Sequence, residues 1–221
     1  MLSTLISLFL AVLPASVQAY SNPGSCTGHC WAHDPSLIQR SSDGVYFLFN
    51  TGGAIGISKA SSLAGPWTYE GNAIASGKSS IDLTGNTDLW APDVQKYAVS
   101  TFGTQVSAIG YATSTTLEAG SWTDHGSLGV ASKAGSAYNA IDPNLVLVGS
   151  TYYLTFGSFW NDIYQVKLAN PPTKTTGTAS YQVAYDTSGD HPAEGSFVYY
   201  YGGYYYLLWS QGICCGYATY V

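Results

Sequence analysis

The chain has 221 residues, of which only 9% are charged, and its net charge at pH 7 is −6. An acidic surface with few Lys and Arg side chains excludes nucleic acids and anionic membranes as favoured partners, because both are bound mainly through basic residues. The 19 tyrosines and six tryptophans are unusually many for this length, and exposed aromatic rings suit the apolar faces of neutral sugars.

The N-terminus has the pattern of a secretory signal peptide. An apolar run over residues 5–13 is followed by small side chains at Val17 and Ala19, which form the small-residue pattern of a cleavage site. The run is too short to span a bilayer, so a transmembrane anchor is the weaker alternative. We therefore predict a signal peptide over residues 1–19, one domain over residues 20–221, and a secreted, extracellular protein.

The chain contains four cysteines, Cys26, Cys30, Cys214 and Cys215. Disulfide bonds are expected in an oxidising compartment, but four cysteines allow three pairings, and the sequence does not choose among them. The adjacent pair Cys214 and Cys215 does not have the spacing of zinc ligands. We interpret the cysteines as structural.

A pattern of short strands repeats about every fifty residues along the chain. In four segments a carboxylate precedes an apolar strand, and these carboxylates are Asp34, Asp93, Asp142 and Glu194. Two of the intervals also contain a strand that leads to a Trp-Thr pair, at residues 67–68 and 122–123. Each period therefore holds about four strands, which is the content of one β-propeller blade.

Equivalent positions on successive propeller blades face the same end of the central channel. We therefore expect the four carboxylates to converge on one small volume, where they could carry out acid–base chemistry. The alternative is that each carboxylate is a structural cap of its own blade. Asp93 is the member of the set for which this alternative is strongest.

The motifs around these carboxylates resemble those of the fungal endo-1,5-α-L-arabinanases of glycoside hydrolase family 43. The resemblance runs from about residue 20 to the end of the chain, and it is carried by His33-Asp34-Pro35, Leu89-Trp90-Ala91-Pro92-Asp93, residues 138–144, Gly157-Ser158-Phe159-Trp160 and Glu194-Gly195-Ser196. It implies an all-β, five-bladed β-propeller and hydrolysis of α-1,5-linked L-arabinofuranosyl bonds in plant arabinan, with inversion of configuration.

The resemblance also implies a role for each of three carboxylates. Asp34 would be the general base, Glu194 the general acid, and Asp142 the residue that tunes the pKa of the acid and orients it. Inversion requires a base and an acid on opposite sides of the sugar, about 6.5–9.5 Å apart, so that a water molecule fits between them. Repulsion from a neighbouring carboxylate such as Asp142 would help Glu194 to keep its proton.

The resemblance further implies a set of substrate-binding residues, and His33 is expected to support the base. The predicted substrate-binding residues are Trp90, Asp93, Asn139, Ser158, Phe159 and Trp160. Tryptophan faces together with amide and hydroxyl groups suit a neutral pentose chain. For Trp90 and Trp160 the alternative is a packing role within their blades.

Two features depart from the family pattern. The segment between Asp93 and Gly103 is shorter than its counterparts, so we expect blade two to lack a turn and most of one strand. The chain also ends within blade four, so we expect about four blades, with blade five missing, as in a truncated gene product. The family holds a metal ion, commonly calcium, in the channel with the help of a histidine from the last blade. Because no histidine follows His191, we expect this calcium site to be lost with the missing last blade and assign no metal-binding residues.

Two alternatives to an endo-acting enzyme stay open at this point. One is an exo-acting arabinofuranosidase or xylosidase on the same scaffold, and the other is an inactive, carbohydrate-binding propeller. In each case the expected partner is a neutral plant polysaccharide, and the protein is expected to be a monomer.

Overall fold

The computed structural model describes residues 24–187, 189–213 and 218–220. The predicted signal peptide, Cys214 and Cys215 lie outside the described residues. In the described part of the chain, no helix is long and apolar enough to cross a membrane.

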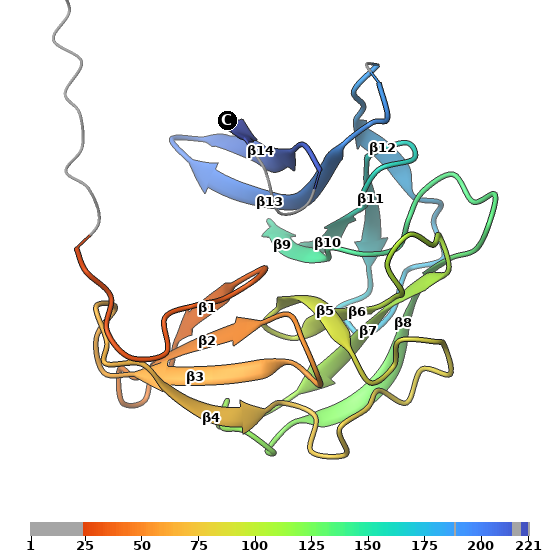
Figure 1. Ribbon diagram of the computed structural model, residues 1–221. Coiled ribbons are helices and arrows are strands. Elements are labelled where there is room, and N and C mark those ends of the chain that lie inside the picture. The colour runs from red at the N-terminus through yellow and green to blue at the C-terminus, as the bar shows by residue number, and fades with distance from the viewer. Residues whose placement is uncertain (1–23, 188, 214–217, 221) are drawn as a thin grey trace, which may run out of the picture.

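Four antiparallel sheets follow one another along the chain (Figure 1). The first contains β1 (Ser36–Gln39), β2 (Tyr46–Asn50), β3 (Gly56–Ala60) and β4 (Thr68–Asn72), and the second contains β5 (Leu89–Asp93), β6 (Lys96–Val99), β7 (Ser107–Thr113) and β8 (Thr123–Ser132). The third contains β9 (Asn144–Val148), β10 (Thr151–Phe156), β11 (Ile163–Leu168) and β12 (Tyr181–Ala184), and the fourth contains β13 (Ala193–Tyr201), β14 (Tyr204–Gln211) and β15 (Ala218–Tyr220). In every sheet the strands are ordered as in the sequence, which is the topology of a propeller blade.

The first strand of each sheet is the innermost one. Figure 1 shows β1, β5, β9 and β13 at the inside of the arrangement, with the later strands of each sheet further out. Strand β1 contacts β5, and β9 contacts β13. The predicted all-β propeller architecture is therefore confirmed for four consecutive blades.

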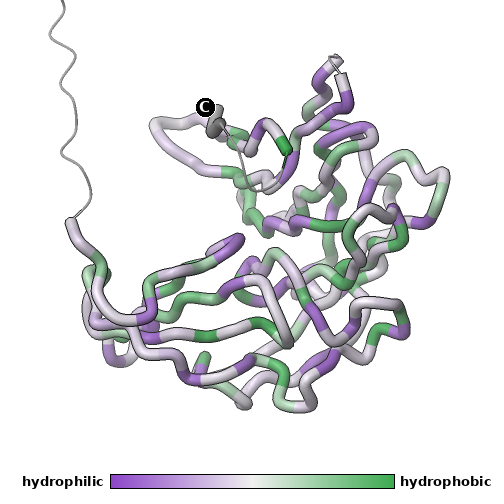
Figure 2. The backbone as a smooth tube through the Cα atoms, in the orientation of Figure 1, coloured by the Kyte–Doolittle hydropathy of each residue, from purple (hydrophilic) through white to green (hydrophobic). Residues whose placement is uncertain are grey.

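Hydrophobic side chains of neighbouring blades pack together in two clusters. Figure 2, in which the backbone is coloured by hydropathy, shows hydrophobic residues along the strands of the blades. Alternate residues of a strand point to opposite faces of its sheet, so each blade can bury residues toward both neighbours. Blades one and two share a cluster that includes Phe47, Phe49, Ile57, Leu89, Val99 and Trp122. Blades two and three share another that includes Ile109, Leu128, Leu154, Phe156 and Val166.

The repeated Trp-Thr pairs have equivalent places in blades one and two. Trp67 and Trp122 are buried directly before β4 and β8, and each indole N–H donates to a backbone carbonyl, that of Leu63 and that of Leu117. The repeat recognised in the sequence is therefore a repeat of structure.

Blade two contains four strands, so the expectation that it lacks most of a strand was wrong. Its inner strand β5 begins at Leu89, before the carboxylate of Asp93, and the turn to β6 follows Asp93 directly. The shorter sequence therefore removes the tip of the β5–β6 hairpin. A hairpin can be trimmed at its turn without the loss of a strand, because both strands shorten together.

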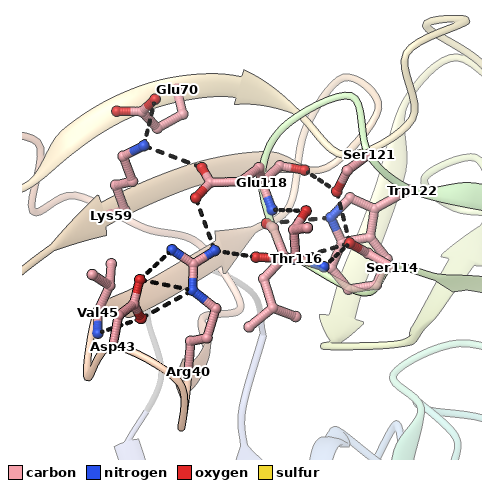
Figure 3. Close-up of polar contacts among 11 residues, drawn as sticks. Arg40, Asp43, Val45, Lys59, Glu70, Ser114, Thr116, Glu118, Ser121 and Trp122 are labelled. Carbon is pink, nitrogen blue, oxygen red and sulfur yellow. Dashed lines mark hydrogen bonds and ion pairs between the residues drawn. The ribbon is translucent and has the colours of Figure 1, made fainter.

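A network of ion pairs joins the outer parts of blades one and two (Figure 3). Arg40, which follows β1, contacts Asp43 at 2.6 Å and Glu118 of the β7–β8 connection at 2.8 Å. Lys59 of β3 contacts Glu118 at 3.1 Å and Glu70 of β4 at 3.2 Å. Glu118 thus receives a cation on each carboxylate oxygen and ties its loop to the neighbouring blade.

The N-terminal segment is closed by a disulfide between Cys26 and Cys30, which answers part of the pairing question that the sequence left open. The backbone of this segment is tied to blade one. The N–H of Trp67 donates to the carbonyl of Thr27, and the N–H of His29 donates to the carbonyl of Trp67.

Candidate active site

Four residues with positive φ occupy the same position in the four blades. Asp34, Ala91 and Asp142 have φ values of 47°, 44° and 54°, and Gly195 has 62°. Each of the first three is followed by proline in the sequence. A left-handed conformation costs about 1–2 kcal/mol for a residue other than glycine. Its repetition therefore marks a bend that the architecture requires, and we call these four residues the blade bends.

Hydrogen bonds between successive blades, near the inner strands, confirm this equivalence. In each case the acceptor is a side chain two residues after the bend of one blade. The donor is the backbone N–H of the residue three positions after the bend of the next blade. The three bonds are Ser36 Oγ with Val94 N–H at 3.1 Å, Asp93 Oδ2 with Leu145 N–H, and Asn144 Oδ1 with Val198 N–H at 2.9 Å. We call these three bonds the inter-blade belt.

Asp34, Asp142 and Glu194 line one cavity of about 890 Å³ at the inside of the propeller. Asp34 and Asp142 stand at blade bends, and Glu194 directly precedes the bend at Gly195. Three of the four carboxylates picked out in the sequence are therefore brought together, and they come from blades one, three and four.

Asp34 is held from two sides. Its Oδ2 accepts a hydrogen bond of 2.6 Å from the hydroxyl of Thr51, and its Oδ1 lies 3.4 Å from Nε2 of His33. The Asp34 side chain is 39% exposed. A carboxylate with this access can accept a proton from a bound water molecule.

Asp142 is enclosed more deeply, and its Oδ2 accepts a hydrogen bond of 2.9 Å from the N–H of Gly195. Burial raises the pKa of Asp142 well above its ordinary value, and the negative charges of Glu194 and Asp34 raise it further. The charges of Glu194 and Asp34 therefore act on Asp142 and favour its protonated form.

Glu194 is oriented by blade three. The hydroxyl of Ser158, in the connection between β10 and β11, donates a hydrogen bond of 2.6 Å to Glu194 Oε2. The same connection is joined to the Glu194 strand by a bond of 3.1 Å from the N–H of Phe159 to the carbonyl of Ala193. Both contacts fix the direction from which the carboxyl group meets the cavity.

Aromatic and amide side chains form much of the remaining wall. Trp90, Asn139, Ser158, Phe159 and Trp160 all line the cavity. Phe159 and Trp160 are consecutive residues with positive φ, 52° and 53°, and backbone strain of this kind is concentrated at functional sites. The indole N–H of Trp90 donates to Asp88, so one edge of this ring is fixed.

Asp93 does not have the place that we expected from its spacing. The bend position of blade two is occupied by Ala91, and Asp93 stands two residues later, in the inter-blade belt. Burial raises the pKa of Asp93, and Asp93 is not among the residues that line the cavity. Its bonds to blade three indicate a structural role, so we do not propose that it contacts substrate.

The family model described as "Glycosyl hydrolases family 43" matches residues 27–221 of this chain. The chain belongs to this family. The match includes all four blades and every carboxylate of the cavity.

Family 43 relatives resemble the chain in sequence and in structure. Arabinan endo-1,5-alpha-L-arabinosidase A of Aspergillus aculeatus is 56% identical over 227 residues, covering 99% of this chain and 70% of the relative. The GH43 endo-arabinanase from Bacillus licheniformis has a TM-score of 0.73 and 29% identity, covering 87% of this chain and 69% of that chain. An exo-1,5-alpha-L-arabinanase from a bovine ruminal metagenomic library has a TM-score of 0.73 and 30% identity, covering 84% and 66% of the two chains.

The structure adds four notable residues to the cavity wall that the sequence did not single out: Thr51, Asp88, Phe102 and His191. Phe102 is 81% exposed, in the connection between β6 and β7. Only His191 carried a signal, since it lies three residues before Glu194. The others come from connections that approach the cavity only when the blades are assembled.

Side chains that commonly bind metals do not cluster in the described part of the chain. No group of three or more His, Cys, Asp or Glu side chains among them is arranged to hold a metal ion. Asp34 and Asp142 instead bond to a hydroxyl and to a backbone N–H, which are hydrogen-bond donors.

Proposed function

We propose that this chain hydrolyses internal α-1,5-linked L-arabinofuranosyl bonds of arabinan with inversion of configuration. The observation that carries the proposal is the convergence of Asp34, Asp142 and Glu194 in one aromatic-walled cavity of a family 43 chain. The Aspergillus relative that carries this activity in its name is 56% identical to the chain.

In the proposed reaction Asp34 is the general base and Glu194 the general acid. Asp34 removes a proton from a water molecule, whose oxygen forms a bond to the anomeric carbon of the arabinosyl unit. The glycosidic bond breaks at the same time, and Glu194 gives its proton to the departing oxygen. Both carboxyl groups are restored when protons exchange with solvent. Asp142 tunes the acid through its charge and orients it, because it bonds to the residue next to Glu194.

The substrate-binding wall is proposed to be formed by Trp90, Asn139, Ser158, Phe159 and Trp160. Stacked aromatic faces bind the apolar faces of sugar rings, and amide and hydroxyl groups bind their hydroxyl groups. A neutral pentose polymer fits such a wall. We propose that the protein acts as a monomer, without nucleic-acid or membrane partners.

We propose that the protein is secreted after removal of residues 1–19. The disulfide between Cys26 and Cys30 supports this, because disulfides persist mainly in oxidising compartments.

Size analysis of the products from linear arabinan tests the mode of attack. Endo cleavage rapidly shortens the polymer and produces a ladder of oligosaccharides. The exo-acting structural neighbour makes exo cleavage the second candidate, and exo cleavage would release one short product while most chains stay long. Asp34→Ala is the inactive control. Binding of arabinan without any cleavage would instead favour a carbohydrate-binding propeller.

A further inference from the structure

Asp34 and Asp142 occupy the same blade position but reach the following blade differently. The carboxyl group of Asp142 accepts directly from the N–H of the next bend, Gly195, at 2.9 Å. Between blades one and two, the hydroxyl of Thr51 stands in this place. It accepts from the N–H of the next bend, Ala91, at 2.7 Å and donates to Asp34 Oδ2 at 2.6 Å.

The direction of both hydrogen bonds at Thr51 is fixed by chemistry. A backbone N–H can only donate, so the hydroxyl oxygen of Thr51 must accept from Ala91. The single hydroxyl proton is then directed to Asp34. Asp34 Oδ2 is therefore the acceptor of the one proton that the Thr51 side chain can donate.

The position of Thr51 is also fixed by its backbone. Its N–H donates to the carbonyl of His33, the residue before Asp34, at 2.9 Å. The next two residues are bound to blade two, because Gly52 N–H donates to the carbonyl of Leu89 and Gly53 N–H donates to Asp88. The hydroxyl therefore lies on a turn that is held by both blades.

We propose that Thr51 is a positioning residue for the general base. Its hydroxyl separates the Asp34 carboxyl group from the blade junction, turns it toward the cavity and keeps it ready to accept a proton. The inference rests on the proposed function, in which Asp34 is the base. This role of Thr51 explains why Asp34 and Asp142, which stand at equivalent bends, have different surroundings.

Three variants test the role of the hydroxyl. Thr51→Val removes it at nearly constant shape, and Thr51→Ser keeps it. Thr155→Val is the matched control, because the Thr155 hydroxyl is buried in β10 and has no hydrogen-bond partner among the described residues. If Thr51→Val has a lowered melting temperature, Thr51→Ala is used in its place. Thr51→Ala also removes the hydroxyl, but it places no methyl group against the N–H of Ala91.

We expect Thr51→Val to lower kcat on linear arabinan by about 10- to 100-fold, the usual effect of losing a hydrogen bond to a charged group. KM should change by less than about twofold, since the hydroxyl of Thr51 is used within the protein. Thr51→Ser should restore most of kcat, and Thr155→Val should behave as the unsubstituted protein. Equal losses in the Val and Ser variants would overturn the proposal.

Carbon-13 NMR of the Asp34 carboxyl group gives a readout that does not depend on turnover. In Thr51→Val the resonance of this group should move from its position in the unsubstituted protein at the same pH, because Oδ2 loses its hydrogen bond, and in Thr51→Ser it should stay nearly in place. An unchanged resonance in Thr51→Val would refute the role of Thr51 even if the enzyme is active. If the unsubstituted chain cleaves no arabinan, the proposed function fails, while the resonance still decides whether Thr51 positions Asp34.

Discussion

At the scale of single residues, the two aspartates of the blade bends differ in their surroundings. Asp142 is enclosed, bonds directly to Gly195, and has a pKa raised by burial and by two neighbouring carboxylates. Asp34 is 39% exposed and bonds through Thr51. One repeated backbone position therefore yields two carboxyl groups suited to different tasks. Repulsion among the carboxylates of the cavity should lower the stability of the folded protein, as is common for active sites.

The raised pKa of Asp142 predicts a pH-dependent stability. A carboxyl group whose pKa is higher in the folded state favours folding below its unfolded value, near 3.8, and this contribution is lost as the pH rises through the folded value. Asp142→Asn keeps an acceptor for Gly195 but removes the charge. We expect its melting temperature to exceed that of the unsubstituted protein at pH 7 by about 2 °C or more.

The advantage of Asp142→Asn should disappear below about pH 4, where Asp142 is protonated in both folded and unfolded chains. Thermal melts between pH 3 and pH 8 check this. Asp82→Asn is the control, because Asp82 is exposed and lies outside the cavity. A stability gain that is equal at all pH values would show that the charge of Asp142 is not its cause.

The assignment of the acid predicts the behaviour of Glu194→Gln. The amide can still accept from Ser158 but has no acidic proton, so kcat on arabinan should fall by about 10²- to 10⁴-fold. Binding of arabinohexaose, measured by calorimetry, should change little. Glu70→Gln, which alters a carboxylate of the outer ion-pair network, should leave kcat unchanged. Full activity in Glu194→Gln would show that another residue is the general acid.

At the scale of strands and blades, the sequence predicted much of the architecture. The strand pattern and the Trp-Thr pairs repeat because each blade buries the same faces, and this was visible without a structure. The error at Asp93 arose because carboxylates were matched by residue type, whereas the blades are equivalent by backbone bend. Ala91 holds that bend, and an alanine gave no chemical signal. Thr51 was missed because its partners lie on two different blades.

The inter-blade belt predicts a specific loss of stability. Asn144 is buried; its Oδ1 accepts from Val198 N–H, and its Nδ2 lies 3.4 Å from Asp93 Oδ2. Asn144→Ala leaves both groups without this partner, which should lower the free energy of unfolding by about 2–4 kcal/mol. Urea denaturation measures this loss.

Ser196→Ala provides a control for the belt from the adjacent inner strand. The Ser196 hydroxyl is buried and has no hydrogen-bond partner among the described residues, so its removal breaks no bond and should cost less than about 1 kcal/mol. Similar losses in Asn144→Ala and Ser196→Ala would mean that the belt does not hold the blades together.

At the scale of the whole molecule, the cavity is a product of assembly. Asp34, Trp90, Asp142 and Glu194 come from four successive blades, so no blade contains both the proposed acid and the proposed base. The inter-blade belt aligns the inner strands, and the ion pairs of Arg40 and Glu118 join blades one and two further out. The distance between acid and base therefore depends on how the blades are placed.

The configuration of the first-formed product tests the central claim most directly. Proton NMR of the anomeric region is recorded in the first minutes of arabinan hydrolysis, before the new reducing ends equilibrate. Inversion by Asp34 and Glu194 predicts that the α-linkage yields the β-anomer first, and that both Asp34→Ala and Glu194→Gln suppress this signal. Initial appearance of the α-anomer would show retention and would contradict an inverting base at Asp34.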